Sequence, residues 1–242
     1  MSTFADLLHT IPEPDIREVP IAEPGVETGF APEYAVWDAE QFAAEQIGQL
    51  VRQVFLPGWS KPARQVVLSP VDQETDISEV CLRVGETLAS QVAGSVCVVE
   101  ADLPVPKTAD EPPLTSAAFG GVGTLREVSR RLSSRLWLVT QDTLMGENQE
   151  GFSAAWLRGR LAEFRLEFDY TVLQGPAAGM YSQAALLGHL CDGLILVLQA
   201  NATRRVAAAR VQEALRAAHA RLLGTVLVER TFPIPQSIYR KL

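Results

Sequence analysis

The chain has 242 residues, of which 47% are apolar, and a formal net charge of −8. Its length and apolar share suffice to bury the core of one domain, whereas the acidic balance argues against sequence-independent binding of nucleic acid or of anionic lipid. No apolar run approaches the roughly 18 residues of a membrane span, and the N-terminus lacks the basic-then-apolar order of a signal peptide. We therefore expect a cytoplasmic protein without membrane insertion.

Residues 1–33 differ from the rest of the chain in composition. They contain five prolines and seven acidic residues but only one base, Arg17. Such a segment has little to bury, so we expect a disordered acidic tail followed by one domain over residues 34–242. The domain begins with a predicted helix, in which Asp38 and Gln41 form a capping pair and the chain stops at Pro57. Four apolar residues follow helical spacing and should pack on a sheet: Ile47, Leu50, Val51 and Val54.

From residue 65 onward, short apolar strands alternate with helical patterns. The strands are expected at residues 65–68, 95–99, 136–139, 170–173, 193–198 and 222–228, and the helices at 77–91, 125–132, 153–164, 182–190 and 203–219. This order predicts an α/β fold with a doubly wound, mostly parallel sheet flanked by helices. In the last of these helices, Val206, Val211, Leu215 and Ala218 are expected to be buried.

The first strand, loop and helix have the outline of a phosphate-binding P-loop. Such a loop needs glycines so that backbone N–H groups surround a phosphate, a lysine for the terminal phosphates and a Ser or Thr hydroxyl for magnesium. Residues 69–78 instead read S-P-V-D-Q-E-T-D-I-S. The start of the helix is better suited to capping by Asp72, Glu74 or Asp76 than to holding a nucleotide.

Three further segments point to one family: V-V-E-A-D-L-P-V-P at 98–106, F-D-Y-T-V-L-Q-G-P at 168–176 and F-P-I-P-Q-S-I-Y-R at 232–240. From residue 65 to the end, the chain resembles the cytoplasmic P-loop ATPase and tyrosine-kinase domains of bacterial capsule and exopolysaccharide operons. These are relatives of the partition and division-site ATPases. The resemblance implies a P-loop NTPase-like fold and a nucleotide site where the strands end.

Most positions of that implied nucleotide site have changed. On the family pattern G-E-G-K-[ST], the two glycines fall on Glu74 and Asp76, the lysine falls on Ile77, and only Ser78 matches. Of the family's later residues, the two acids are kept as Glu100 and Asp102, the following arginine becomes Pro104, and the metal-supporting aspartate becomes Gln174. Seven of these positions, without Pro104, are the candidate site residues: Glu74, Asp76, Ile77, Ser78, Glu100, Asp102 and Gln174.

The substitutions disfavour ATP. Two carboxylates about 5 Å from phosphate oxygens would each cost roughly 3 kcal/mol at an effective dielectric constant near 20. We therefore expect a vestigial site with no cofactor and no metal ligands. A simpler interpretation is that Ser78, Glu100 and Asp102 are ordinary capping and strand-end residues with no inherited role.

Two functions remain open at this point. The first is a non-catalytic, P-loop-derived regulator or scaffold in exopolysaccharide or capsule biosynthesis. Its partner would be a membrane-anchored polysaccharide chain-length protein or a homologous subunit, and a homo-oligomer is compatible with it. The alternative is an ATP-binding tyrosine kinase or ATPase whose site is rewired or completed by a partner. Kinases of the family resemble one another in a tyrosine-rich C-terminal cluster, and this tail has Tyr239 alone, which favours the scaffold.

Three other groups of residues could in principle form binding sites. Cys81, Cys97 and Cys191 lie in or beside apolar segments and match no zinc spacing, so buried thiols are expected. The glycines of segment 120–123 favour a turn, because no strand-to-helix unit surrounds them. The helix at 203–219 carries several arginines, which are either simply solvated or bind an acidic partner or the chain's own acidic tail.

Overall fold

The computed structural model describes residues 39–56, 62–101, 103, 124–146 and 152–229. Several sequence predictions fall outside these residues: the acidic segment, the capping residue Asp38, the helix stop at Pro57, the site residue Asp102, the glycines of 120–123 and Tyr239. They stay predictions.

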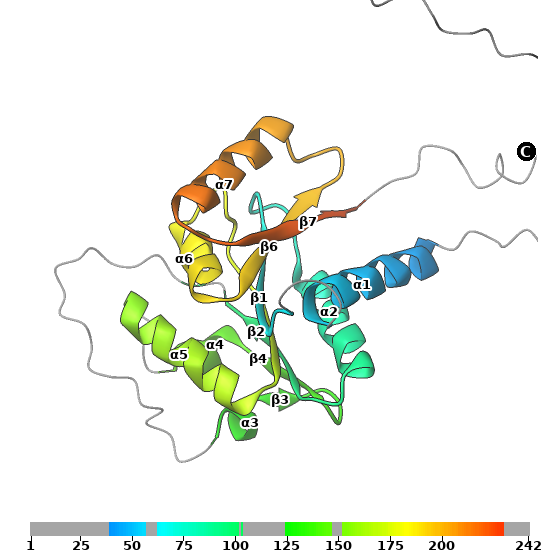
Figure 1. Cartoon of the computed structure of the whole chain (residues 1–242), viewed down its shortest axis with the longest axis vertical. Coiled ribbons are helices and arrows are strands. Elements are labelled where there is room, and N and C mark those ends of the chain that lie inside the picture. Colours follow the sequence, from blue (N-terminus) through cyan, green and yellow to red (C-terminus); the bar gives the residue numbers. More distant parts are fainter. Residues whose placement is uncertain (1–38, 57–61, 102, 104–123, 147–151, 230–242) are drawn as a thin grey trace, which may run out of the picture. The chain divides into compact units, whose positions relative to one another are not determined.

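A seven-stranded sheet forms the centre of the domain, with the strand order β3-β4-β2-β5-β1-β6-β7 (Figure 1). Its strands are β1 (Gln65–Pro70), β2 (Val96–Glu100), β3 (Arg130–Arg131), β4 (Leu136–Val139), β5 (Tyr170–Gln174), β6 (Gly193–Gln199) and β7 (Leu222–Val228). All neighbouring strands are parallel except β3 and β4. The predicted doubly wound, mostly parallel sheet is thereby confirmed.

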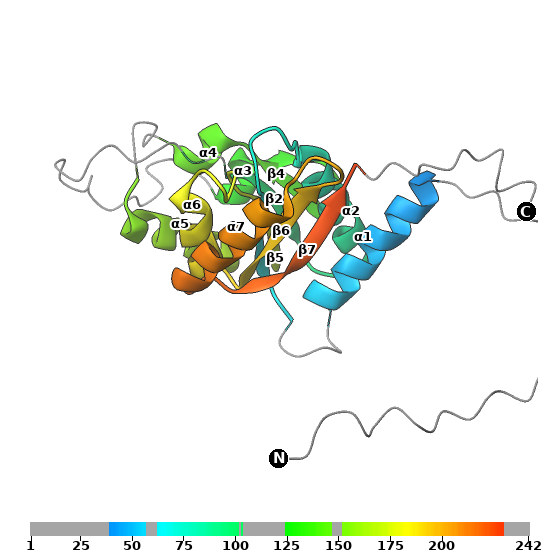
Figure 2. The same cartoon turned by 90° about the horizontal axis from the view of Figure 1, so that it is seen from above.

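Helices cover both faces of this sheet. They are α1 (Ala39–Phe55), α2 (Ser78–Gln91), α3 (Leu125–Val128), α4 (Gln141–Met145), α5 (Ala154–Glu167), α6 (Ser182–Leu190) and α7 (Arg205–Ala217). Helices α1 and α2 lie on one face, and α5, α6 and α7 on the other (Figure 2). Because side chains alternate along a strand, Val66 and Leu68 of β1 join the core under α1 and α2, whereas Val67 joins the opposite core.

The predicted N-terminal helix packs where its apolar spacing indicated. Val51 and Phe55 of α1 are fully buried, and the Phe55 ring meets the Tyr170 ring of β5 edge-on with centroids 6.2 Å apart. Ile47, Leu50 and Val54 pack against the same core. The helix thus contributes to the domain core from a position before the first strand.

The helix predicted at 125–132 is wrong in its second half. Helix α3 ends at Val128, and Arg130 and Arg131 instead form β3, pairing antiparallel with Leu138 and Trp137 of β4. The guanidinium of Arg131 lies 5.6 Å from the centre of the Trp137 ring. An eight-residue helix gains few internal hydrogen bonds for its nucleation cost, so strand pairing and the aromatic contact prevail. The short helix α4 was not predicted.

The expected buried face of α7 is also partly wrong. Val211 and Leu215 are buried, but Val206 is 63% exposed and Ala218 is exposed. Val206 precedes Val211 by five residues, which places it about 140° away around a helix with 3.6 residues per turn. The residues nearer the buried side in that first turn and a half are Ala207 and Ala208, which pack against the core.

The three cysteines are buried and free, as predicted. Burial raises the pKa of the Cys81 thiol to about 12, and it also raises the pKa of Cys97 and of Cys191. At neutral pH these thiols stay protonated and are poor nucleophiles. They serve as small apolar core residues.

Candidate functional site

The carboxyl ends of β1, β2 and β5 adjoin one another, and two predicted site residues meet there. The Gln174 amide at the end of β5 donates a hydrogen bond from Nε2 to the Ser78 hydroxyl at the start of α2, over 3.0 Å. Glu100, the last residue of β2, is the register partner of Gln174. The fold therefore brings Ser78, Glu100 and Gln174 to the crevice where doubly wound sheets bind ligands.

Asp76 lies one residue before the N-cap of α2, Ile77, and its carboxylate bonds the start of the helix. Its Oδ1 accepts the backbone N–H of Ser78 over 2.9 Å. This hydrogen bond, followed by one from the Ser78 hydroxyl, lowers the pKa of Asp76, so the carboxylate is ionised at neutral pH. Of the three capping candidates from the sequence, Asp76 is the one that bonds an N–H of the first turn of α2.

Ile77, at the position of the family's lysine, is part of the core. It is 2% exposed and belongs to the buried cluster under α1 and α2 that contains Leu68 and Cys81. Its backbone carbonyl accepts the N–H of Cys81 over 2.9 Å. The side chain at this position therefore packs inward, where it stabilises the start of α2.

The loop between β1 and α2 lacks the backbone form that glycines would allow. Within the described residues, the non-glycine positions with positive φ are Asn201, His219 and Glu229, so Glu74 and Asp76 do not adopt the left-handed conformation. Glu74 is exposed. This part of the loop thus differs from a phosphate-binding turn in backbone conformation as well as in side chains.

Asp72 was missed as an organising residue of this loop. Its Oδ1 accepts the hydroxyl of Thr75 over 2.6 Å, and its Oδ2 accepts the hydroxyl of Thr203 over 3.2 Å. The Thr203 hydroxyl in turn accepts the backbone N–H of Gln199 over 2.9 Å. Asp72 thereby ties the β1–α2 loop to the loop between β6 and α7. The Asp-x-x-Thr spacing is a sequence signal for the local bond, but nothing in the sequence marks Thr203.

The loop after β5 fastens the same region from a second side. The backbone N–H of Gly179 donates to the Val71 carbonyl over 3.0 Å, and a Cβ on Gly179 would lie 2.4 Å from that oxygen. Glycine is therefore required for this close approach. At the end of the same loop, the Gln73 amide donates to the Tyr181 hydroxyl over 2.5 Å.

Charge and metal-binding capacity are limited in the described part of the site. Asp76 bonds Ser78, Glu100 is the register partner of Gln174, and Asp102 lies outside the described residues. Among the residues that the structure describes, no three His, Cys, Asp or Glu side chains are grouped to hold a metal ion. None of the helices in the described part of the chain has the length and hydropathy needed to cross a bilayer.

Comparisons with solved structures show which fold the chain shares. No family model matches the chain. In fold, it resembles the VpsO kinase domain, with a TM-score of 0.54, 17% identity, and coverage of 79% of this chain and 98% of that one. The chimerical protein CapA2B2 gives the same TM-score at 15% identity, covering 76% of this chain and 83% of the other. The chain thus shares the α/β fold of these two solved structures.

Similarity in sequence indicates more specifically which proteins are related to this chain. The chain is 33% identical over 126 residues to the tyrosine-protein kinase CpsD of Streptococcus agalactiae serotype III, covering 46% of this chain and 54% of that protein. It is 25% identical over 114 residues to the tyrosine-protein kinase YwqD of Bacillus subtilis, covering 47% and 48%. The chain thus spans about half the length of these curated relatives. The family resemblance expected from the sequence is confirmed: its relatives are bacterial tyrosine kinases.

Proposed function

We propose that this chain is a non-catalytic, P-loop-derived regulator or scaffold in bacterial capsule or exopolysaccharide biosynthesis, acting on the cytoplasmic side of the membrane. The setting follows from the kinase relatives and from the sequence segments that resemble the family. The loss of catalysis is supported above all by Ile77. A residue that should reach the terminal phosphates is an apolar side chain with 2% exposure.

Two further observations support an inactive site. Asp76 supplies the helix start with an internal anion, which occupies the N–H that a phosphate would use. The hydroxyl of Ser78, the remaining magnesium ligand of the family pattern, accepts a hydrogen bond from the neutral Gln174 amide. A magnesium shell is normally built from carboxylates and phosphates, and an amide adds no charge to it.

Titration calorimetry with Mg-ATP tests this proposal. The expected result is no binding tighter than about 1 mM, because the lysine attraction is absent and the loop carries carboxylates. The matched comparison is the quadruple variant Glu74→Gly, Asp76→Gly, Ile77→Lys and Gln174→Asp, in which we expect a measurable gain in affinity if it remains folded. Micromolar binding of Mg-ATP by the unchanged protein would contradict the proposal.

The function then rests on a partner protein. We propose a membrane-anchored polysaccharide chain-length protein or a homologous active subunit, contacting the carboxyl ends of the strands near Glu100 and Gln174. Pull-down from a bacterial lysate, with either the unchanged protein or its Glu100→Lys variant as bait, tests the contact. Equal recovery of the same partner at equal salt sensitivity would exclude this surface.

The alternative function retains one supporting observation. Ser78 matches the family pattern and still meets the end of β5 through Gln174, 3.0 Å away, so an ATP-binding kinase or ATPase site completed by a second chain keeps one family residue in place. It predicts ATP binding that appears only when the partner is added. The same calorimetry with the partner present therefore separates the two functions.

A further inference from the structure

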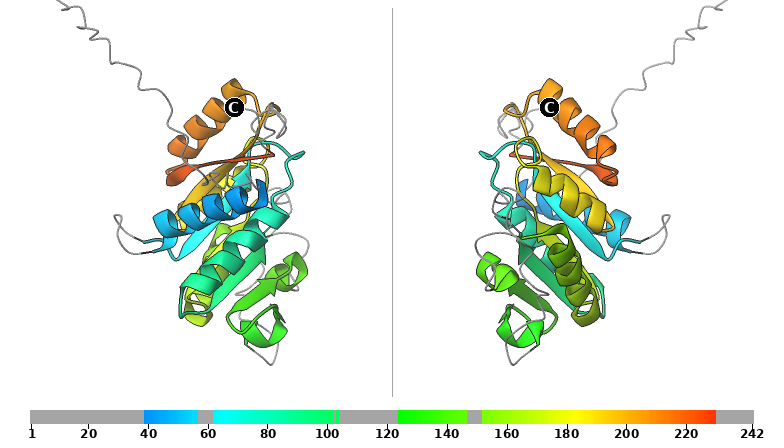
Figure 3. Two further views of the ribbon diagram at one scale, coloured as in Figure 1. Left: turned by 90° about the vertical axis from the view of Figure 1, so that its right-hand side faces the viewer. Right: turned by 90° about the vertical axis from the view of Figure 1, so that its left-hand side faces the viewer.

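The two edges of the sheet differ in how they are protected against pairing with another chain. At one edge, β3 is two residues long and both residues are arginines. At the other edge, β7 has seven residues, L-L-G-T-V-L-V, with no charge and no proline. Figure 3 shows these strands at opposite ends of the sheet, β3 in green and β7 in red. Short, charged strands resist edge pairing, whereas a long apolar edge invites it.

The outer side of β7 presents backbone hydrogen-bonding groups that no strand of the described residues pairs with. Val228 is the register partner of Gln199, and its carbonyl accepts the N–H of Ala200 over 2.9 Å, so Val228 bonds toward β6. Because backbone groups alternate in direction along a strand, Thr225 and Leu227 direct their N–H and C=O groups away from β6. In the described residues no strand pairs with that side. Leu227 is 53% exposed and Thr225 is exposed.

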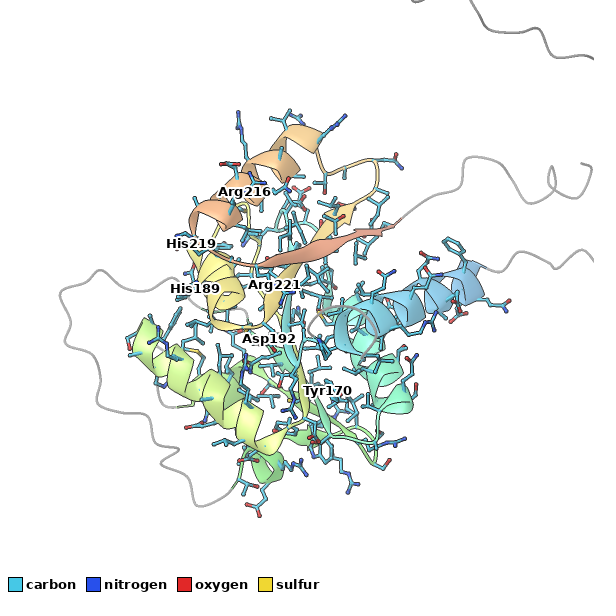
Figure 4. All side chains as sticks on the ribbon, viewed as in Figure 1. Tyr170, His189, Asp192, Arg216, His219 and Arg221 are labelled. Atoms are coloured by element: carbon cyan, nitrogen blue, oxygen red, sulfur yellow. The ribbon has the colours of Figure 1, made fainter. Side chains whose placement is uncertain are left out.

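A basic helix flanks this edge. Helix α7 packs on β7, and the chain enters β7 directly from Arg221; Figure 4 labels Arg221 there and Arg216 on the helix. Arg216 pairs with Glu213 over 2.8 Å. Four other exposed arginines of α7 and its two flanks have no acidic partner among the described residues: Arg204, Arg205, Arg210 and Arg221. The region therefore carries a local positive charge in a chain of net charge −8.

We propose that the outer edge of β7 binds an extended acidic segment of a partner protein as an additional strand. Main-chain bonds to Thr225 and Leu227 would hold the segment, and its carboxylates would lie near the arginines of α7. A second copy of this chain fits less well, because pairing two β7 edges brings two basic helices together. Nucleic acid offers phosphates but no peptide groups for the open edge. The proposal concerns a surface other than the candidate site and does not depend on the proposed function.

The test uses the full chain and a fluorescein-labelled, terminally blocked peptide of about nine residues that alternates Glu and Val. Fluorescence anisotropy should give saturable binding that weakens as salt rises from about 50 to about 300 mM. Thr225→Pro removes an outward N–H without touching the bonds to β6, and we expect it to weaken binding about tenfold. Arg205→Glu/Arg210→Glu should weaken it by a similar factor. The matched control, Arg130→Glu/Arg135→Glu at the opposite edge, should bind as the unchanged protein does.

Amide hydrogen exchange gives a second measurement if Thr225→Pro does not fold. In the unchanged protein, saturating peptide should slow exchange at Thr225 and Leu227, and leave Val226 unchanged because its N–H already bonds to β6. The proposal is overturned by an absence of saturable binding, or by binding that leaves those two amides unprotected. Equal competition by a DNA oligonucleotide of matched charge, or a dimer in sedimentation that buries this edge, would also overturn it.

Discussion

The amino ends and the carboxyl ends of the strands use carboxylates in different ways. At the amino ends, Asp192 accepts the backbone N–H groups of Arg64 and Gln65, both over 2.8 Å, and the guanidinium of Arg165 over 2.9 Å. At the carboxyl ends, Asp76 bonds a residue two positions away, Ser78, and Glu74 is exposed. Asp192 connects segments more than 100 residues apart, as Asp72 does at the carboxyl ends, whereas Asp76 holds one helix start and Glu74 holds none.

Carboxylates at the amino ends therefore serve the stability of the fold, whereas several at the carboxyl ends lie beside the proposed site. Asp169 repeats the pattern of Asp192, since it accepts the N–H and hydroxyl of Ser95 over 2.8 and 2.9 Å and pairs with Arg64. Polar groups at the amino ends are thus consumed by the fold itself. At the carboxyl ends, Glu74 and Glu100 carry charge that no such network among the described residues absorbs. Ligands of doubly wound sheets bind at the carboxyl ends, so the freer charges lie on the side of the proposed site.

The largest expected effect comes from removing Asp192. Asp192→Ala leaves the N–H groups of Arg64 and Gln65 without their acceptor, and Gln65 is fully buried. We expect the free energy of unfolding to fall by about 2–4 kcal/mol. Urea denaturation at pH 7 measures it.

The control for that variant is Glu74→Ala at the opposite end, which should change the free energy of unfolding by no more than about 0.5 kcal/mol. Equal losses in the two variants would break the distinction between the two ends of the sheet.

Acid should act mainly through the amino ends. The hydrogen bonds from Ser95 lower the pKa of Asp169, aided by Arg64 and Arg126. Burial raises the pKa of Asp192, but its bonds from Arg64, Gln65 and Arg165 outweigh burial and lower it overall. A carboxyl with a lowered folded pKa contributes stability that is present above its unfolded pKa, near 4, and is lost as pH falls through the folded pKa.

The prediction is a loss of stability below about pH 4 that becomes shallower in Asp169→Asn/Asp192→Asn. Urea denaturation across a pH series gives the slope for both proteins. An unchanged slope in the double variant would show that other carboxyls control acid unfolding.

The sheet was predictable because each of its main strands is a short apolar run between helical patterns. The start and end of β4, α6 and β7 agree with the sequence prediction to the residue. The error at Arg130 and Arg131 arose where local helical spacing competes with strand pairing to Trp137, which lies later in the chain. The prediction that Val206 is buried was wrong for a related reason, because its burial depends on which side of α7 meets the sheet.

The candidate site was predictable in position and less so in its contacts. Strand ends placed Glu100 and Gln174 beside each other, because parallel strands bring their carboxyl ends to one edge. The contact between Asp72 and Thr203 joins residues 131 positions apart, and no periodic pattern encodes it. The inward packing of Ile77 could not be predicted either, because an isoleucine at a helix start can be buried or exposed. Its position follows only from the packing of the core.

A small effect is expected for the two family positions that still touch. Ser78 and Gln174 are joined by one hydrogen bond of 3.0 Å at a solvent-accessible position, so their coupling should be about 0.5–1 kcal/mol. A double-mutant cycle of Ser78→Ala and Gln174→Ala, measured by urea denaturation, isolates this coupling energy.

A ligand that bound between Ser78 and Gln174 would compete for the same Ser78 hydroxyl. Adding Mg-ATP should therefore leave the coupling energy unchanged if the site is vestigial. A coupling energy that shifts with Mg-ATP would mean that nucleotide reaches Ser78, and the carboxyl ends would then be a working site.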